Sequence, residues 1–166
     1  MQNIQIRKFA PEDGPSSARL FYDTVHTINR KDYTEEQLDA WAPKERDLEA
    51  WTDSFQSHTA FVAEMEGRIV GFGDMDETGY LDRLYVHRDF QGKGIASALC
   101  DALEQAVPAK GFLTHASLTA YSFFQRRGYR VLKEQRVIRH GVSLTNFVME
   151  KKNCPETMAS GQVSFS

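Results

Sequence analysis

The chain is short of features that would place it in several large classes of proteins. It has two cysteines among 166 residues, Cys100 and Cys154, and neither their number nor their spacing favours a disulfide framework or a metal site. No run of 18 apolar residues is present, and Met1 is followed by polar residues and a strand pattern. We therefore expect a cytoplasmic protein with no membrane span, no membrane partner and no secretory signal.

An excess of charge of one sign is also missing. The formal net charge is -3, so no general attraction to nucleic acid or to an anionic membrane is expected. Internal repeats are absent as well. What remains is the ordinary composition of a globular protein, with 41% hydrophobic and 26% charged residues, in a length that suits one domain.

Two common phosphate-binding loops cannot be found in the chain. It contains neither Gly-x-Gly-x-x-Gly nor Gly-x-x-x-x-Gly-Lys-Ser/Thr at a position where a strand meets a helix. Residues 91–96 instead read Gln-Gly-Lys-Gly-Ile-Ala, between a predicted strand over residues 80–86 and a predicted helix over residues 95–107. Apolar residues recur three or four positions apart in that helix, and Pro108 ends it.

The start of this helix is a predicted anion site. A helix N-terminus presents backbone N–H groups without intrahelical partners and carries partial positive charge. Gly92 and Gly94 remove side chains that would keep an anion away from those donors, and Lys93 can add a full positive charge. The residue types predict a pyrophosphate cradle, and a structural strand–loop–helix without a ligand is the alternative.

The loop resembles a signature of a known family. Residues 91–96 are similar to the Gln/Arg-x-x-Gly-x-Gly/Ala motif of the GNAT superfamily of acyl-CoA-dependent N-acetyltransferases, and residues 32–41 and 144–151 look like a bacterial branch of small, mostly uncharacterised members. The resemblance implies acetyl-CoA as the acyl donor and no metal. The cofactor-binding residues that it implies are Leu84, Tyr85, Val86, Gln91, Gly92, Lys93, Gly94, Ile95, Ala96, Ser97 and Phe124. Arg126, in a series of basic residues, is the candidate for contact with the 3′-phosphate of the cofactor, and a solvated charged face is the alternative.

The remaining patterns predict a mixed α/β fold around one mostly antiparallel sheet, in the order β-α-α-β-β-β-α-β-α-β-β. This order is similar to that of GNAT proteins over residues 3–151. Hairpins are predicted at Glu66-Gly67 and at His140-Gly141, and residues 34–37 read as a capping box. Residues 1–152 are the predicted acetyltransferase domain, and residues 153–166 are a predicted polar tail.

The resemblance implies that the sheet splays between residues 80–86 and residues 112–117, with the acyl-CoA in the gap and the backbone of Tyr85 or Val86 polarising the thioester carbonyl. Asp82 is the first candidate for a base or a water-positioning group, on the strand face that it is predicted to share with Leu84 and Val86. An ordinary ion pair is the alternative. His115 on the facing strand could serve instead, unless it is only packed.

One position departs from the family pattern. Many members have a tyrosine where this chain has Phe124, and that tyrosine protonates the departing thiolate. Tyr121 lies three residues earlier and is the candidate replacement, with an ordinary packed tyrosine as the alternative. A thiol is far more acidic than an alcohol, so the thiolate can also leave without a dedicated acid.

The acceptor is expected against the helical region, where His26, Tyr33 and Trp41 are candidate contacts, each with a purely structural alternative. The predicted activity is transfer of an acetyl group to a primary amine of a small molecule or a protein, in a ternary complex, by a monomer or a homodimer. A non-catalytic acyl-CoA-binding or regulatory module is the alternative. An RNA-directed acetyltransferase would need a basic groove that the net charge of -3 does not indicate.

Overall fold

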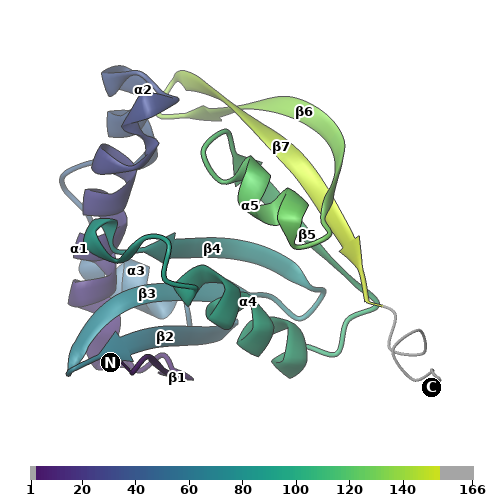
Figure 1. Cartoon of the computed structure of the whole chain (residues 1–166). Helices are drawn as coiled ribbons and strands as arrows, with labels where there is room; N and C mark the ends of the chain where they lie inside the picture. Colours follow the sequence, from purple (N-terminus) through teal and green to yellow (C-terminus); the bar gives the residue numbers. More distant parts are fainter. Residues whose placement is uncertain (1–2, 154–166) are drawn as a thin grey trace.

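The computed structural model describes residues 3–153, so Cys154 and the predicted tail beyond Asn153 lie outside the described residues. Within them a seven-stranded sheet has the order β1-β2-β3-β4-β5-β7-β6 (Figure 1). All neighbours are antiparallel except β4 and β5. This confirms the predicted mixed, mostly antiparallel class. The strands are β1 Gln5–Lys8, β2 Thr59–Met65, β3 Arg68–Met75, β4 Tyr80–Val86, β5 Gly111–Ser117, β6 Arg130–Arg139 and β7 Val142–Lys152.

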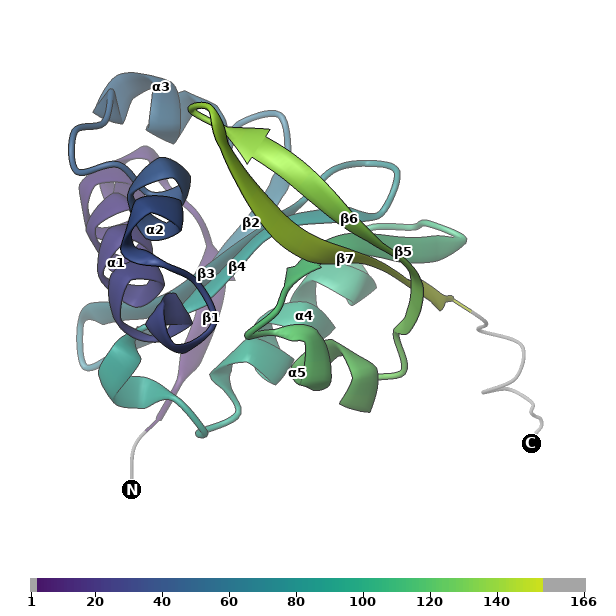
Figure 2. The same cartoon turned by 90° about the horizontal axis from the view of Figure 1, so that it is seen from above.

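Helices cover both faces of the first four strands (Figure 2). The helices are α1 Gly14–Thr27, α2 Glu35–Trp41, α3 Leu48–Asp53, α4 Ile95–Ala106 and α5 Tyr121–Arg126. Of these, α1 and α4 pack on the first four strands, α2 contacts β7, and α5 packs on β5 and β6. The predicted order contained only two helices before the second strand, and α3 is a third. No helix among residues 3–153 is long and apolar enough to cross a membrane.

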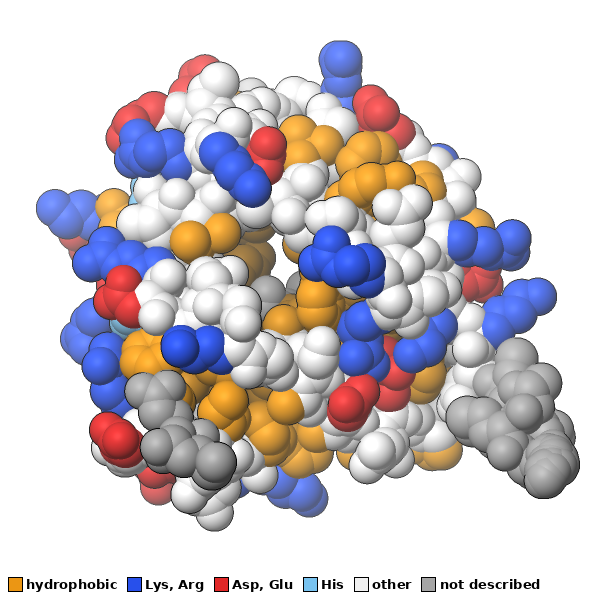
Figure 3. Space-filling model, in the orientation of Figure 1, with side chains coloured by type: hydrophobic (Ala, Val, Ile, Leu, Met, Phe, Trp, Pro, Cys, Tyr) orange, Lys and Arg blue, Asp and Glu red, His pale blue; other side chains and the backbone are white. Residues whose placement is uncertain are grey.

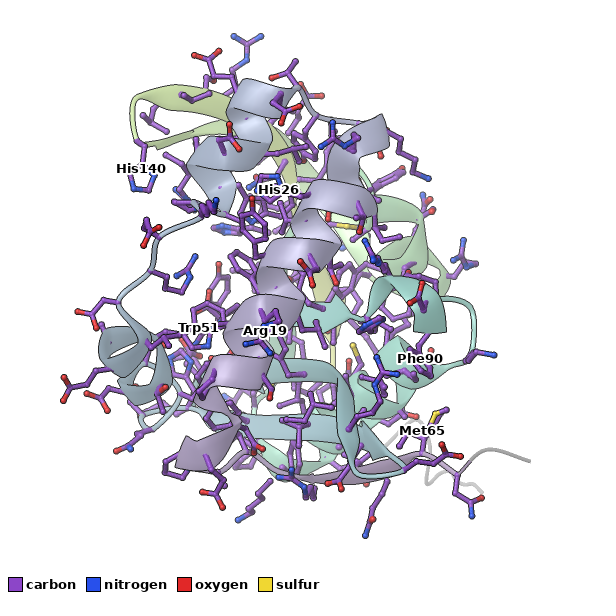
Figure 4. The ribbon with its side chains drawn as sticks, turned by 90° about the vertical axis from the view of Figure 1, so that its left-hand side faces the viewer. Arg19, His26, Trp51, Met65, Phe90 and His140 are labelled. Atoms are coloured by element: carbon purple, nitrogen blue, oxygen red, sulfur yellow. The ribbon has the colours of Figure 1, made fainter. Side chains whose placement is uncertain are left out.

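Alternation along β3 decides which helix packs on which face. Phe72 points toward α3, where its ring lies 5.9 Å from that of Trp51. Trp51 in turn points from α3 toward α1 (Figure 4). Gly71 points the other way, and a Cβ there would lie 2.9 Å from Ile95 of α4. The glycine is therefore needed because α4 packs directly against the backbone of β3.

Local turn chemistry fixes both predicted hairpins. Glu66 and Gly67 have φ of 53° and 79°, and His140 and Gly141 have φ of 49° and 78°. Two consecutive positive φ angles are the requirement of a tight hairpin turn whose twist matches the flanking strands. The capping box is also present, since the Thr34 hydroxyl accepts from the N–H of Gln37 and the Gln37 side chain accepts from the N–H of Thr34.

The sheet is split between β4 and β5. These two strands pair only at Tyr80–Leu113 and Leu81–Thr114, and the Thr114 hydroxyl donates to the Leu81 carbonyl at 3.1 Å. Beyond Leu81 the strands diverge, and the β6–β7 hairpin arches from the far side of the split to α2 (Figure 1). The hairpin meets α2 through His140, whose Nδ1 lies 2.9 Å from the Ala40 carbonyl oxygen.

A β-bulge interrupts β4 next to the split. Asp74 of β3 lies opposite Arg83, and the next residue, Met75, lies opposite Leu81, so Asp82 is an extra residue in the ladder. The Asp82 carboxylate lies within 4.8 Å of that of Asp74, on the α3 side, whereas Leu84 packs into the core under α4. The predicted face of Asp82, shared with Leu84 and Val86, was therefore wrong, because a bulge re-aims the side chain.

Candidate functional site

A long groove runs from the start of α4 to the split in the sheet, and we call it the α4 groove. Every predicted cofactor-binding residue except Lys93 lines it. The lining comprises Thr24, Ile28, Asn29, Lys31, Leu84, Tyr85, Val86, Phe90, Gln91, Gly92, Gly94, Ile95, Ala96, Ser97, Ser117, Thr119, Ala120, Ser122, Phe123, Phe124 and Arg126.

The loop before α4 has the geometry of an anion site. Gly92 and Gly94 have φ of 72° and 82°, and a Cβ at either position would meet no other atom within 4 Å. Gly94 is the N-cap, and no side chain caps the helix. The first N–H groups of α4 are thus left for a ligand in the open space beside the glycines, a space that suits a phosphate group.

Two side-chain bonds hold this loop and α1 to the end of β4. The Gln91 amide donates to the Val86 carbonyl at 2.7 Å, and the Thr24 hydroxyl of α1 donates to the same oxygen at 3.0 Å. Gln91 therefore positions the loop with its side chain, and only its backbone remains to face a ligand.

A second cavity lies beneath the β6–β7 hairpin, and we call it the hairpin cavity. Its lining comprises Tyr33, Trp41, Tyr80, Leu81, Asp82, Arg83, Leu84, Tyr85, Thr114, His115, Ala116, Ser117, Ala120, Phe124, Val137, Arg139, Leu144, Thr145 and Asn146. Leu84, Tyr85, Ser117, Ala120 and Phe124 line the α4 groove too, so the two spaces meet at the split. Figure 3 shows this face hollowed at its centre, with apolar side chains in the depth.

Asp82 reaches the hairpin cavity from the bulge in β4. Burial against the surrounding protein raises its pKa, and the nearby charge of Asp74 raises it further. Asp74 itself is fully buried and accepts hydrogen bonds from the Arg83 guanidinium at 3.0 and 2.6 Å. His58 completes the cluster, with its Nδ1 2.7 Å from Asp74 Oδ2. Sequence reasoning missed Asp74 and His58, and an acid inside the otherwise apolar strand β3 was the available signal.

His115 lies on the other wall of the hairpin cavity. Its ring packs edge-on against Tyr80 at 5.2 Å, and its Nδ1 lies 3.4 Å from the Gln135 amide nitrogen. Partial burial lowers the pKa of His115, and the positive charge of Arg139 lowers it further, which favours the neutral imidazole. A neutral imidazole there can accept a proton.

The two aromatic candidates on α5 have different surroundings. Phe124 is 4% exposed and lines both the α4 groove and the hairpin cavity. Tyr121 lines neither, and its ring packs on Phe147 with 4.9 Å between centroids. The structure does not bring Tyr121 to the split, so its role as a proton donor lacks geometric support.

The three residues predicted to contact the acceptor also differ in where they lie. Tyr33 and Trp41 line the hairpin cavity, with their rings 5.2 Å apart. His26 lies on α1 (Figure 4) and lines neither space. Its Nε2 lies 2.8 Å from the Ala42 carbonyl oxygen, and its ring stacks on Tyr22 at 4.2 Å, so His26 ties α1 to the end of α2.

Comparisons with known proteins agree with one another. A sequence model of the acetyltransferase (GNAT) domain matches residues 29–151. The chain is 35% identical over 153 residues to the uncharacterized N-acetyltransferase YafP of Escherichia coli strain K12, which covers 92% of this chain and 98% of that protein.

Solved structures show the same similarity. A GCN5-related N-acetyltransferase from Rhodopseudomonas palustris superposes with a TM-score of 0.88 at 31% identity, covering 92% of this chain and 98% of that one. The PaiA N-acetyltransferase of Thermoplasma acidophilum, crystallised with coenzyme A, superposes with a TM-score of 0.73 at 19% identity, covering 91% and 99%. The second similarity is one of fold alone.

Proposed function

This chain belongs to the GNAT superfamily of acetyltransferases, and from that premise we propose that it moves the acetyl group of acetyl-CoA to a primary amine by direct transfer in a ternary complex. The observation that carries the proposal is the junction of the α4 groove and the hairpin cavity at the split between β4 and β5. A donor in one space and an acceptor in the other can meet there without a covalent enzyme intermediate.

The α4 groove is the proposed coenzyme site. The N–H groups at the start of α4 would hold the pyrophosphate, the unpaired edge of β4 would bind the pantetheine arm, and Arg126 would face the 3′-phosphate. The PaiA structure, which has the same fold, is a complex with coenzyme A, and this supports coenzyme A as the ligand of the proposed site. Acetyl-CoA supplies an activated acyl group as a thioester.

Asp82 is the proposed proton acceptor. When the acceptor nitrogen attacks the thioester carbon, a C–N bond forms and the C–S bond breaks, and Asp82 takes the proton that the nitrogen loses, directly or through water. A raised pKa suits a base because it makes the carboxylate a better proton acceptor. A backbone N–H of Tyr85 or Val86 donates to the carbonyl oxygen as it becomes negative. Phe124 shields the junction but cannot donate a proton, so the sulfur leaves as a thiolate.

Release of free thiol from acetyl-CoA in the presence of a broad panel of primary amines tests the proposal. We expect amine-dependent thiol release together with an N-acetylated product. Saturable coenzyme A binding without turnover of any amine would favour the rival function, a non-catalytic acyl-CoA-binding or regulatory module.

A further inference from the structure

The hairpin cavity carries opposite charges on two of its walls. Asp82, on β4, is the one Asp or Glu among its lining residues, and Arg83 beside it is already engaged by Asp74. On β6 the cavity is lined by Arg139, which has no carboxylate partner among residues 3–153. The one hydrogen bond of its side chain within those residues goes to the Ile138 carbonyl at 3.3 Å. The cavity thus offers one carboxylate and one uncommitted guanidinium.

A polar atom without a partner marks the same cavity near the split. The side-chain oxygen of Asn146 is buried and has no hydrogen-bond donor among the described residues. Asn146 lies opposite Ser117, which lines both the cavity and the α4 groove. A buried carbonyl oxygen without a donor is costly, and an N–H group of a bound molecule would satisfy it.

We infer that the acceptor is a small amine that also carries a carboxylate, as an α-amino acid does. This inference rests on the proposed acetyl transfer. The amine lies between Asp82 and Asn146, and the carboxylate pairs with Arg139 in the planar, two-bond geometry that guanidinium groups favour. The free volume of about 150 Å³ suits a small molecule. Polyamines and aminoglycosides fit poorly, since their several cations would meet one carboxylate and the repelling charge of Arg139.

Matched pairs of substrates test this inference. Each pair is an α-amino acid and the amine formed by its decarboxylation, assayed for thiol release with acetyl-CoA. We expect kcat/KM to favour the amino acid by about tenfold or more, the value of one charged hydrogen bond. Arg139→Gln should remove the preference by raising KM for the amino acid alone. Arg136→Gln is the control, because Arg136 lies on the same strand but does not line the cavity.

The outcomes separate this inference from the proposed function. Equal or better turnover of the decarboxylated amines would overturn the inference and leave acetyl transfer standing. Calorimetry of amino acids with the coenzyme A-loaded protein resolves the case of no turnover. Binding that Arg139→Gln abolishes would then support the carboxylate site, and no binding would overturn it. In both cases the broad panel of amines decides separately whether acetyl transfer stands.

A separate cluster carries a second inference, about the path of the proton. The Asp82 carboxylate, the fully buried Asp74 carboxylate and a ring nitrogen of His58 lie within 4.8 Å of one another. The Nδ1 of His58 bonds Asp74, and the His58 side chain, 20% exposed, lines a surface pocket outside the hairpin cavity, near Thr52 and Phe55. The charged groups that face this cluster are Asp74 from β3, Asp76 just after that strand, and Asp82 and Arg83 from β4.

We propose that His58 is a positioning and relay residue that passes the proton from Asp82 to solvent. Asp74, whose charge is balanced by Arg83, accepts from the Nδ1–H of His58 and so orients the ring. Nε2 is then the nitrogen that takes the proton of Asp82 through water and releases it to solvent. The proton enters from the hairpin cavity and leaves on the other side of β4, so it need not return past the bound acceptor.

Kinetics of His58→Gln against pH test the relay. We expect kcat to fall about tenfold or more, with coenzyme A affinity and the KM for the amine unchanged, and added imidazole to restore part of the rate. His26→Gln is the control, because His26 is also a largely buried histidine, 10% exposed, but lines neither space. A His58→Gln variant with a lower Tm but an unchanged kcat and pH profile would overturn the relay and leave His58 a structural residue.

Discussion

The hydroxyl group of Tyr33 links the helical region to two segments beyond the split in the sheet, β7 and the loop after β5. It donates to the Thr145 carbonyl of β7 at 2.7 Å and accepts from the Leu118 N–H, between β5 and α5, at 2.9 Å. Tyr33 is 7% exposed and lies just before α2, so one phenol fixes the helical region to both segments. Tyr33 and Thr145 both line the hairpin cavity, so this link joins two of its walls.

Tyr33→Phe should therefore weaken both the fold and the cavity. The substitution leaves a partly buried N–H and C=O without their partner, which costs about 1–3 kcal/mol of unfolding free energy. Urea denaturation measures that loss, and we expect the KM for the amine to rise more than the Kd for coenzyme A. Tyr22→Phe is the control, because no hydrogen bond of the Tyr22 hydroxyl is present among residues 3–153. Equal stability of the two variants would show that the link contributes nothing.

Gly92→Glu should abolish coenzyme A binding. The substitution puts bulk and negative charge into the open space at the start of α4, where the pyrophosphate is proposed to lie. It also forces a side chain into a backbone with φ of 72°, so a control with the same strain is needed. Gly67→Glu supplies it, since Gly67 has φ of 79°, equally open surroundings and no place in the groove. Calorimetry should show lost affinity for Gly92→Glu alone, and unchanged affinity in that variant would refute the cradle.

Asp82→Asn should lower turnover and raise stability at the same time. Loss of a general base reduces kcat by about 100-fold or more at neutral pH. Because burial raises the pKa of Asp82, the folded protein favours the protonated form, and the ionised form at pH 7 opposes folding. The stabilising contribution of a raised carboxyl pKa is complete below the ordinary value and is lost as the pH rises through the folded value. The gain in Tm for Asp82→Asn should be small, because Asp82 remains exposed to solvent, and it should appear at pH 7 and vanish near pH 3. A variant with full activity would place the base elsewhere.

Local sequence patterns were sufficient to predict most of the fold. Gly67 and Gly141 provide the positive φ that each hairpin turn needs at its second position. Thr34 and Gln37 cap the start of α2 through two reciprocal hydrogen bonds. Helical and alternating periods place the strands and α4 within one or two residues, because each period reflects one buried face. The groove at the start of α4 follows from the same local pattern.

The register of strands that are distant in the sequence could not be predicted in the same way. The bulge at Asp82 depends on how β4 pairs with β3, and a shift of one residue reverses the face of every side chain beyond it. The His58–Asp74 contact joins residues that are 16 positions apart through the strand pairing of β2 and β3. Spacing along α5 likewise left open whether Tyr121 or Phe124 faces the split.

Phe124→Tyr tests whether the transfer lacks a proton donor. The new hydroxyl group would lie where the α4 groove meets the hairpin cavity, at the position where many family members have a tyrosine. Because a thiolate is a good leaving group, we expect kcat to change by less than about threefold, apart from a small loss of stability from burying the hydroxyl. Tyr121→Phe is the matched change on the same helix, and its turnover should equal that of the wild type, since Tyr121 packs on Phe147 away from both spaces. A tenfold gain in Phe124→Tyr would show that protonation of the sulfur limits the native enzyme, and a large loss in Tyr121→Phe would restore Tyr121 as the acid.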